Sequence, residues 1–279
     1  MKALKIIIAF VLILAGVFSA FYFSTRVGEG SIAPPQDERF EDTRKQIQNE
    51  WEQRDDWDDT LYTKNLDLVT QLGVKFNTVP LKELNTSLAV EIVYKKIFDE
   101  WKSPTCQRAV VNKYYNAVSF IKSKDSDANT DNNVKLITQV YSVYNQAYTL
   151  AHQSIGLSPN FNGTSWNSYS DYRESMLNKR NNMLSNEVYK THLSNIKDIK
   201  DGLNNIPDKL TTARTTYYKT LAQSIKNYFP TDQWQSRNSA GLEKLRKAID
   251  KYESETGSRN YDLRDFADQY ERDVYTNGW

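Results

Sequence analysis

The chain contains few side chains that carry chemistry by themselves, with one cysteine and two histidines among its 279 residues. Cys106 stands in "SPTC", where Pro104 is a residue type that often begins a helix. A thiol in the first turn of such a helix would be favoured as a thiolate by the helix dipole. Three interpretations of Cys106 remain: a reactive thiol, a bridge between two copies of an exported chain, and a small buried side chain.

The two histidines, His152 and His192, are far apart in the sequence, so a zinc site built on both would need separate helices to bring them together. The sequence also lacks the HExxH, P-loop, dinucleotide-binding, GxSxG and CxxC patterns. We therefore predict no metal site and no cofactor, and we assign no catalytic residue.

Carboxylates are the largest remaining source of chemistry, and the densest group is "RDDWDD" at residues 54–59. Calcium sites need oxygens that converge from a turn, usually with a glycine that permits the bend, and none stands here. We interpret this group as a solvated helix face. Acids on neighbouring helices could still act as general acid and base on a glycan, but with 35 acidic residues the pattern singles out no pair.

Aromatic side chains give the candidates for contact with a partner. The segment "NFNGTSWNSYSDY" contains Phe161, Trp166, Tyr169 and Tyr172 among asparagines and serines, a composition typical of adaptable binding surfaces. Aromatic residues that fold back to cover the end of a helical bundle would give the same pattern. Trp279, at the carboxyl end, is a further candidate for docking into a partner.

The elements that position these residues are predicted to be helices from Asp37 onward, because apolar residues recur every three or four positions and only seven prolines and ten glycines occur. A run with strict 3–4 spacing, residues 134–155, resembles a coiled-coil seam and is filled largely by Tyr141, Tyr144 and Tyr148. These tyrosines are either core within one chain or the interface of a homo-oligomer.

The longest expected helix covers residues 169–203, and residues 156–168 form the longest connection before it, the best place for a sub-boundary. No strand-like alternation is longer than a few residues. The sequence therefore predicts an all-α fold over residues 37–279: an elongated antiparallel bundle, either single or made of two packed sub-bundles.

Residues 6–23, "IIIAFVLILAGVFSAFYF", contain no charge. At ~1.5 Å per residue they would span about 27 Å of a ~30 Å hydrocarbon core. Because Lys2 and Lys5 precede the segment and Arg26 is the only base shortly after it, the positive-inside rule places the amino terminus in the cytoplasm and residues 27–279 outside. We expect a transmembrane anchor at residues 1–24 and a tether at 25–36; a cleaved signal peptide, which would make the protein secreted, is the alternative.

One short start, one membrane span and an external bundle of long helices form a layout similar to that of the LemA family, and "YYNAV" at residues 114–118 resembles a piece of its helix pattern. The segment around Trp51 and Trp57 departs from the order of that family. We assign no family on these five residues.

A formal net charge of +1 argues against a nucleic-acid partner, which would need a concentrated positive field. The anchor, the tether and the tyrosine-rich stripes favour a non-enzymatic, membrane-tethered protein that binds or scaffolds other envelope proteins, or associates with itself. The alternative is an enzyme that acts on cell-wall or surface glycans through carboxylates between helices. A membrane-active lysis protein is a third hypothesis.

Overall fold

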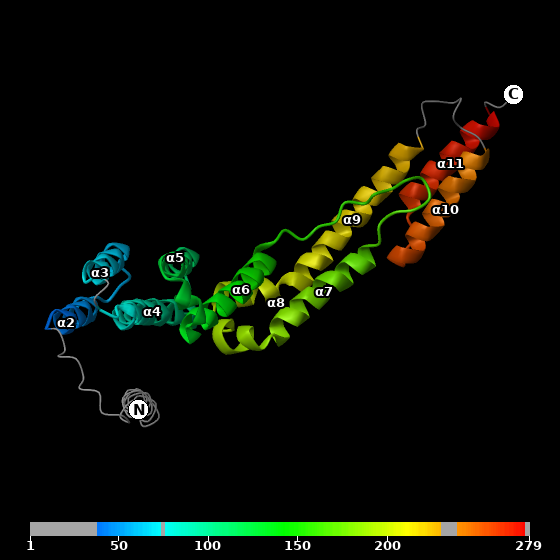
Figure 1. The fold of residues 1–279 in the computed structure, drawn as a ribbon. Helices are drawn as coiled ribbons and strands as arrows, with labels where there is room; N and C mark the ends of the chain where they lie inside the picture. The colour runs from blue at the N-terminus through cyan, green and yellow to red at the C-terminus, as the bar shows by residue number, and fades with distance from the viewer. Residues whose placement is uncertain (1–37, 74–75, 230–238, 277–279) are drawn as a thin grey trace, which may run out of the picture.

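The computed structural model describes residues 38–73, 76–229 and 239–276, and within these ranges helices and turns occur but no strand. The predicted all-α fold is confirmed for this part of the chain. Figure 1 shows an elongated body with α2 to α5 at one end and α9 to α11 at the other. The predicted anchor and tether and Trp279 lie outside the described residues. Among the helices inside those ranges, none has the length and apolar character needed to span a membrane.

The amino-terminal end of the body is built from four helices, with a short 3-10 helix leading into the fifth. They are α2 (Glu38–Glu52), α3 (Asp59–Gln71), α4 (Val79–Lys102), α5 (Arg108–Lys124), η1 (Ser126–Thr130) and α6 (Asn132–His152). The rest consists of α7 (Tyr169–Ser185), the π-helical turn η2 (Tyr189–Leu193), α8 (Lys197–Asn204), α9 (Ile206–Tyr228), α10 (Ser239–Thr256) and α11 (Tyr261–Thr276).

Several helices begin at a polar side chain that accepts hydrogen bonds from the first free backbone N–H groups. Asp58 caps α3, Asp131 caps α6 and Ser168 caps α7. Such a cap contributes about 1 kcal/mol by satisfying donors that would otherwise have no partner in the helix. One member of the acidic group at residues 54–59 is thus used for capping.

Two expected helix boundaries are wrong. Pro104 does not begin a helix, because α4 ends at Lys102 and α5 begins only at Arg108, so Pro104 and Cys106 lie in the turn between them. The long helix expected at residues 169–203 is interrupted twice. At the first break Asn186 adopts an extended backbone, and its side-chain oxygen accepts a hydrogen bond from the Tyr189 N–H, which starts the next helical turn.

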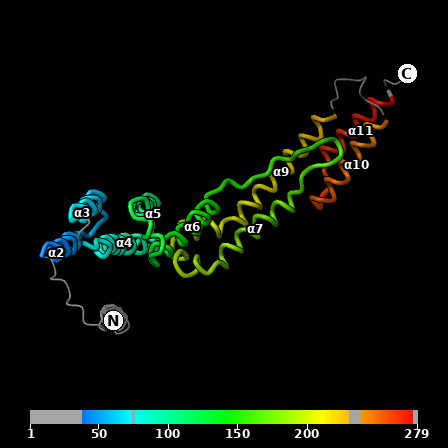
Figure 2. Tube along the Cα trace, in the orientation of Figure 1, coloured from blue at the N-terminus to red at the C-terminus, as the bar shows by residue number. Residues whose placement is uncertain are grey.

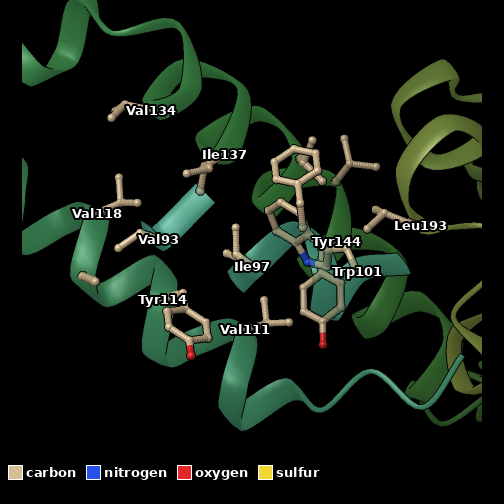
Figure 3. Packing of buried hydrophobic residues seen from close by; sticks show 14 of the residues in the cluster. Val93, Ile97, Trp101, Val111, Tyr114, Val118, Val134, Ile137, Tyr144 and Leu193 are labelled. Atoms are coloured by element: carbon tan, nitrogen blue, oxygen red, sulfur yellow. The ribbon is translucent and has the colours of Figure 1, made fainter. Parts of the chain in front are cut away.

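The interior consists of two hydrophobic clusters. The first joins α2 to α6 with the end of α7, η2, α8 and the start of α9, and Figure 3 shows Trp101, Tyr144 and Ile97 packed at its centre. The second joins α10 and α11 with the remainder of α9 and with Trp166 and Tyr169. Helix α9 therefore belongs to both clusters.

The connection between α6 and α7 packs in the second cluster through Leu157, Phe161 and Trp166. Figures 1 and 2 show that it runs along α9 toward α10 and α11 and then turns back. Gly163 lies at this turn with a φ of 93° and packs directly against the ring of Tyr228. Glycine is suited to the position because it adopts a positive φ without steric cost and has no Cβ to meet the ring.

A candidate binding groove between α6 and α7

A groove of about 600 Å³ lies between α6 and the end of α7, in the middle of the molecule. The π-helical turn η2 contacts both helices and holds the two walls in place. Five of the nine lining residues carry a carboxamide; the full set is Asn145, Gln146, Thr149, Leu150, Gln153, Lys179, Asn182, Met183 and Asn186. We call this site the carboxamide groove.

The carboxamides of this groove are weakly used by the protein itself. Asn145 and Asn182 make no side-chain hydrogen bond with any residue of the described ranges. Gln153 donates to the sulfur of Met176 at 3.2 Å, and a thioether is a weak acceptor. The Oδ1 atom of Asn186 accepts from the backbone of Tyr189. Most of the donors and acceptors in the groove are therefore available to a ligand.

The groove is apolar at its base and nearly neutral at its rim. Leu150 and Met183 are each 8% exposed and belong to the first hydrophobic cluster. Lys179 is the one charged residue in the lining. An apolar floor with a few polar groups above it is the usual construction of a site that binds a ligand by shape and hydrogen bonds.

Acidic residues line other grooves, but each of those grooves takes its acids from a single helix. Asp59 and Asp67 both lie on α3 beside one groove, and Asp262, Asp265 and Asp268 all lie on α11 beside another. Glycan hydrolysis by two carboxylates requires them to face each other across the bond that breaks. Neither of these two grooves offers that arrangement.

The predicted tyrosine seam packs within the chain. Tyr144 is 1% exposed and contributes to the first cluster. Tyr141 stacks on Tyr115 with ring centroids 3.5 Å apart. Tyr148 is covered on its two sides by the ring of His152, at 4.0 Å, and by the guanidinium of Arg108, at 4.3 Å. One ring face of Tyr141 and the ring of Tyr148 are therefore occupied by contacts within the chain.

Cys106 is half-buried beside Tyr144. Burial, with the nearby Glu100 carboxylate, raises the pKa of the thiol to about 12. Cys106 also lies before α5 rather than in its first turn, so the helix dipole does not act on it as expected. The thiol is protonated at neutral pH, and the structural premise for a reactive thiolate is absent.

The aromatic residues predicted to contact a partner attach the α6–α7 connection to the second cluster. Trp166 is buried, its Nε1–H donates to Glu255 at 2.9 Å, and the Lys251 ammonium lies 4.1 Å from its ring. Tyr169 is 2% exposed and donates its hydroxyl hydrogen to the Leu210 carbonyl. Phe161 and Tyr172 are half-buried in the same cluster. Partner contact through these residues remains a prediction, and it would be limited to the exposed parts of Phe161 and Tyr172.

The acidic group at residues 54–59 is not a helix face. Asp55, Asp56 and Asp58 lie in the turn between α2 and α3, and Asp59 is the first residue of α3. The Asp56 carboxylate accepts hydrogen bonds from the Lys113 ammonium at 2.5 Å and the Tyr114 hydroxyl at 2.9 Å. Although partial burial opposes ionisation, these bonds lower the pKa of Asp56. The turn is thereby attached to α5.

A buried polar network that the sequence did not indicate connects α2, α3, α4 and the end of α5. Trp51 donates to Asn85, and Asn85 donates to the Tyr62 carbonyl. The Tyr62 hydroxyl contacts Thr86, which donates to Asp125. Asp125 is only 3% exposed. Its partners are far away in the sequence, so no local signal could have revealed its burial.

The carboxamide groove was also not identified from the sequence, because its residues have the pattern of two solvated helix faces. A hint exists in the one-turn spacing of Asn145, Thr149 and Gln153, but nothing local shows that a second polar face lies opposite. Comparisons of the whole chain with family models, curated proteins and solved structures found no match.

Proposed function

We propose that this protein is a membrane-tethered, non-enzymatic binding or scaffolding protein of the cell envelope, and that the carboxamide groove is its ligand site. The observation that carries this proposal is a preformed groove whose hydrogen-bonding groups are largely unused by the protein. Asn182 is exposed and Asn145 is half-buried, so their amides can bond to water and can exchange that water for a ligand.

The placement outside the membrane is supported by the apolar segment at residues 6–23 and by the charges that flank it. The helical body would then be held close to the membrane, where its elongated form gives it reach. An alkaline phosphatase and a fluorescent protein, each fused to the carboxyl end, test this orientation. The proposal predicts an active phosphatase and a dark fluorescent fusion in a bacterial host, and the reverse pattern would overturn it.

Binding is tested in the native cells with a photo-crosslinking amino acid introduced into the full chain in place of Gln146, an exposed residue at the rim of the groove. Asn116, an exposed carboxamide on α5, is the matched control position. We expect adducts of discrete mass from position 146 and none of those masses from position 116. Adducts of the chain with itself would identify self-association as the mode of binding. The absence of any adduct specific to position 146 would refute the proposed site.

A further inference from the structure

We infer that the carboxamide groove recognises an extended polypeptide segment, chiefly through its main chain. This inference rests on the proposed function and names the class of its ligand. It follows from the spacing of the walls, from the floor and from the charge of the rim, and each of these is visible in the described residues.

The spacing of the α6 wall matches an extended chain. Asn145, Thr149 and Gln153 follow one another at one-turn intervals, which are ~6 Å apart along the helix axis. An extended peptide repeats every two residues, after about 6.6 Å. Successive wall residues therefore meet equivalent backbone groups of a peptide that runs along the helix, and Asn182 and Asn186 offer a similar row on the opposite wall.

The chemistry of the lining also suits a peptide backbone. A carboxamide presents one acceptor and two donors, so it pairs with a backbone N–H and C=O. A site that binds a peptide by its main chain, with little regard to sequence, needs many such groups and few charges in its lining. The lining provides five carboxamides and a threonine hydroxyl against a single cation.

The floor and the rim add side-chain preferences. Leu150 and the flexible, polarizable side chain of Met183 form an apolar base that fits an aliphatic residue of the ligand. Lys179 is exposed and forms no ion pair with any residue of the described ranges. The lining of the groove contains no acidic residue. An acidic ligand residue two positions from the aliphatic one, on the same face of the extended chain, would meet this charge.

A glycan is less suited to the same groove. Sugar rings bind well against the face of an aromatic side chain, and none of the nine lining residues is aromatic. In the neighbouring tyrosine row, Tyr141 already stacks on Tyr115, and Tyr148 contacts His152 and Arg108. A glycan therefore serves as an alternative outcome of the test.

The test uses the full chain in detergent micelles and an array of fluorescein-labelled hexapeptides, Ser-Thr-Zaa-Ser-Xaa-Gly, with Leu, Ile, Met or Ala at Zaa and Asp, Asn or Lys at Xaa. Binding is measured by fluorescence anisotropy, and a fluorescein-labelled N-acetylglucosamine tetramer is titrated in parallel. We expect saturable binding that is strongest for an aliphatic residue with Asp. N-methylation of alternate backbone amides in one register should reduce the affinity about tenfold, since each lost hydrogen bond is worth three- to tenfold.

Variants of the groove assign the binding to it. Asn145→Ala and Asn182→Ala should each weaken binding about three- to tenfold. Lys179→Glu should reverse the preference between Asp and Lys peptides by about threefold or more. Asn116→Ala and Lys95→Glu, at exposed positions on α5 and α4, are the matched controls and should change neither value.

The outcomes separate the inference from the proposed function. Equal binding by the N-methylated peptide, or no effect of the groove variants, overturns main-chain recognition. Failure of every hexapeptide to bind overturns the inference as well. If crosslinked adducts still form at position 146, or if the tetramer binds and is lost in Asn182→Ala, the groove is a binding site for another ligand. If the adducts are also absent, both the inference and the proposed function fail.

Discussion

The carboxylate of Asp125 allows a stringent test of how the amino-terminal helices are held together. Its Oδ1 atom pairs with the Lys82 ammonium at 2.8 Å, and its Oδ2 atom accepts from the Thr86 hydroxyl at 2.7 Å. Burial works against the charged form, but these hydrogen bonds and the Lys82 charge outweigh it and lower the pKa of Asp125. The substitution Asp125→Asn keeps the shape of the side chain and removes the charge.

The expected loss in the free energy of unfolding is about 2 kcal/mol at pH 7. Breaking a fully buried ion pair costs roughly 3–5 kcal/mol, because the remaining charge loses its partner. Here the Lys82 side chain is 36% exposed, so water screens the unpaired ammonium and the expected loss falls below that range. Urea denaturation of the full chain in micelles, followed by far-UV circular dichroism, measures this difference.

The stability difference between the wild type and Asp125→Asn should also depend on pH in a defined direction. The pKa of Asp125 is lower in the folded than in the unfolded chain, so its contribution is complete above the unfolded value of about 4 and is lost as pH falls through the folded value. The gap between the wild type and Asp125→Asn should hold from pH 7 to pH 5 and close in more acidic solution. A gap below ~0.5 kcal/mol at pH 7, or the same gap in the presence of Lys82→Met, would refute the reasoning.

Three further predictions concern the packing of the body. A Cβ at Gly202 would lie 2.6 Å from the Cβ of Ala151, so Gly202→Ala should cost about 1–3 kcal/mol in thermal unfolding, while Gly156→Ala, with open space around it, should be close to neutral. Cys106 should react with iodoacetamide at pH 8 at least tenfold more slowly in the folded than in the urea-unfolded chain, because its pKa is raised to about 12; equal rates measured by mass spectrometry would show that the thiol is not shielded. Trp166→Ala should destabilise the chain by about 3 kcal/mol, since the ring is 8% exposed in the second cluster; a change below 1 kcal/mol in urea denaturation would mean that the α6–α7 connection is only loosely attached.

Local periodicity was enough to predict the helices and much of the first cluster. In the run with 3–4 spacing at residues 134–155, Ile137 and Tyr144 are each at most 1% exposed. The pattern failed where a single residue decides the path of the backbone. Asn186 has an ordinary helical neighbourhood in sequence, yet its side chain ends one helix and starts the next segment.

The candidate site could not be predicted because it depends on which polar faces meet. In the sequence, the carboxamides on α6 and α7 look like ordinary solvated residues. The pattern of one helix does not show which other helix its polar face meets. The residues that did stand out, Trp166 and Tyr169, are large aromatics, and burial in the second cluster accounts for their presence. Composition revealed the aromatic residues, whereas only the long-range packing revealed the groove.

The most direct test of the central claim is to fill the carboxamide groove and look for the partner again. Asn182 is exposed at the rim, so Asn182→Trp should leave the fold intact while occupying the space between α6 and α7. The measurement is the yield of crosslinked adducts from position 146 in the full chain, with Asn116→Trp as the control. We predict that the adducts disappear in Asn182→Trp and persist in Asn116→Trp. Adducts of the same mass and yield in both variants would contradict the assignment of this groove as the binding site.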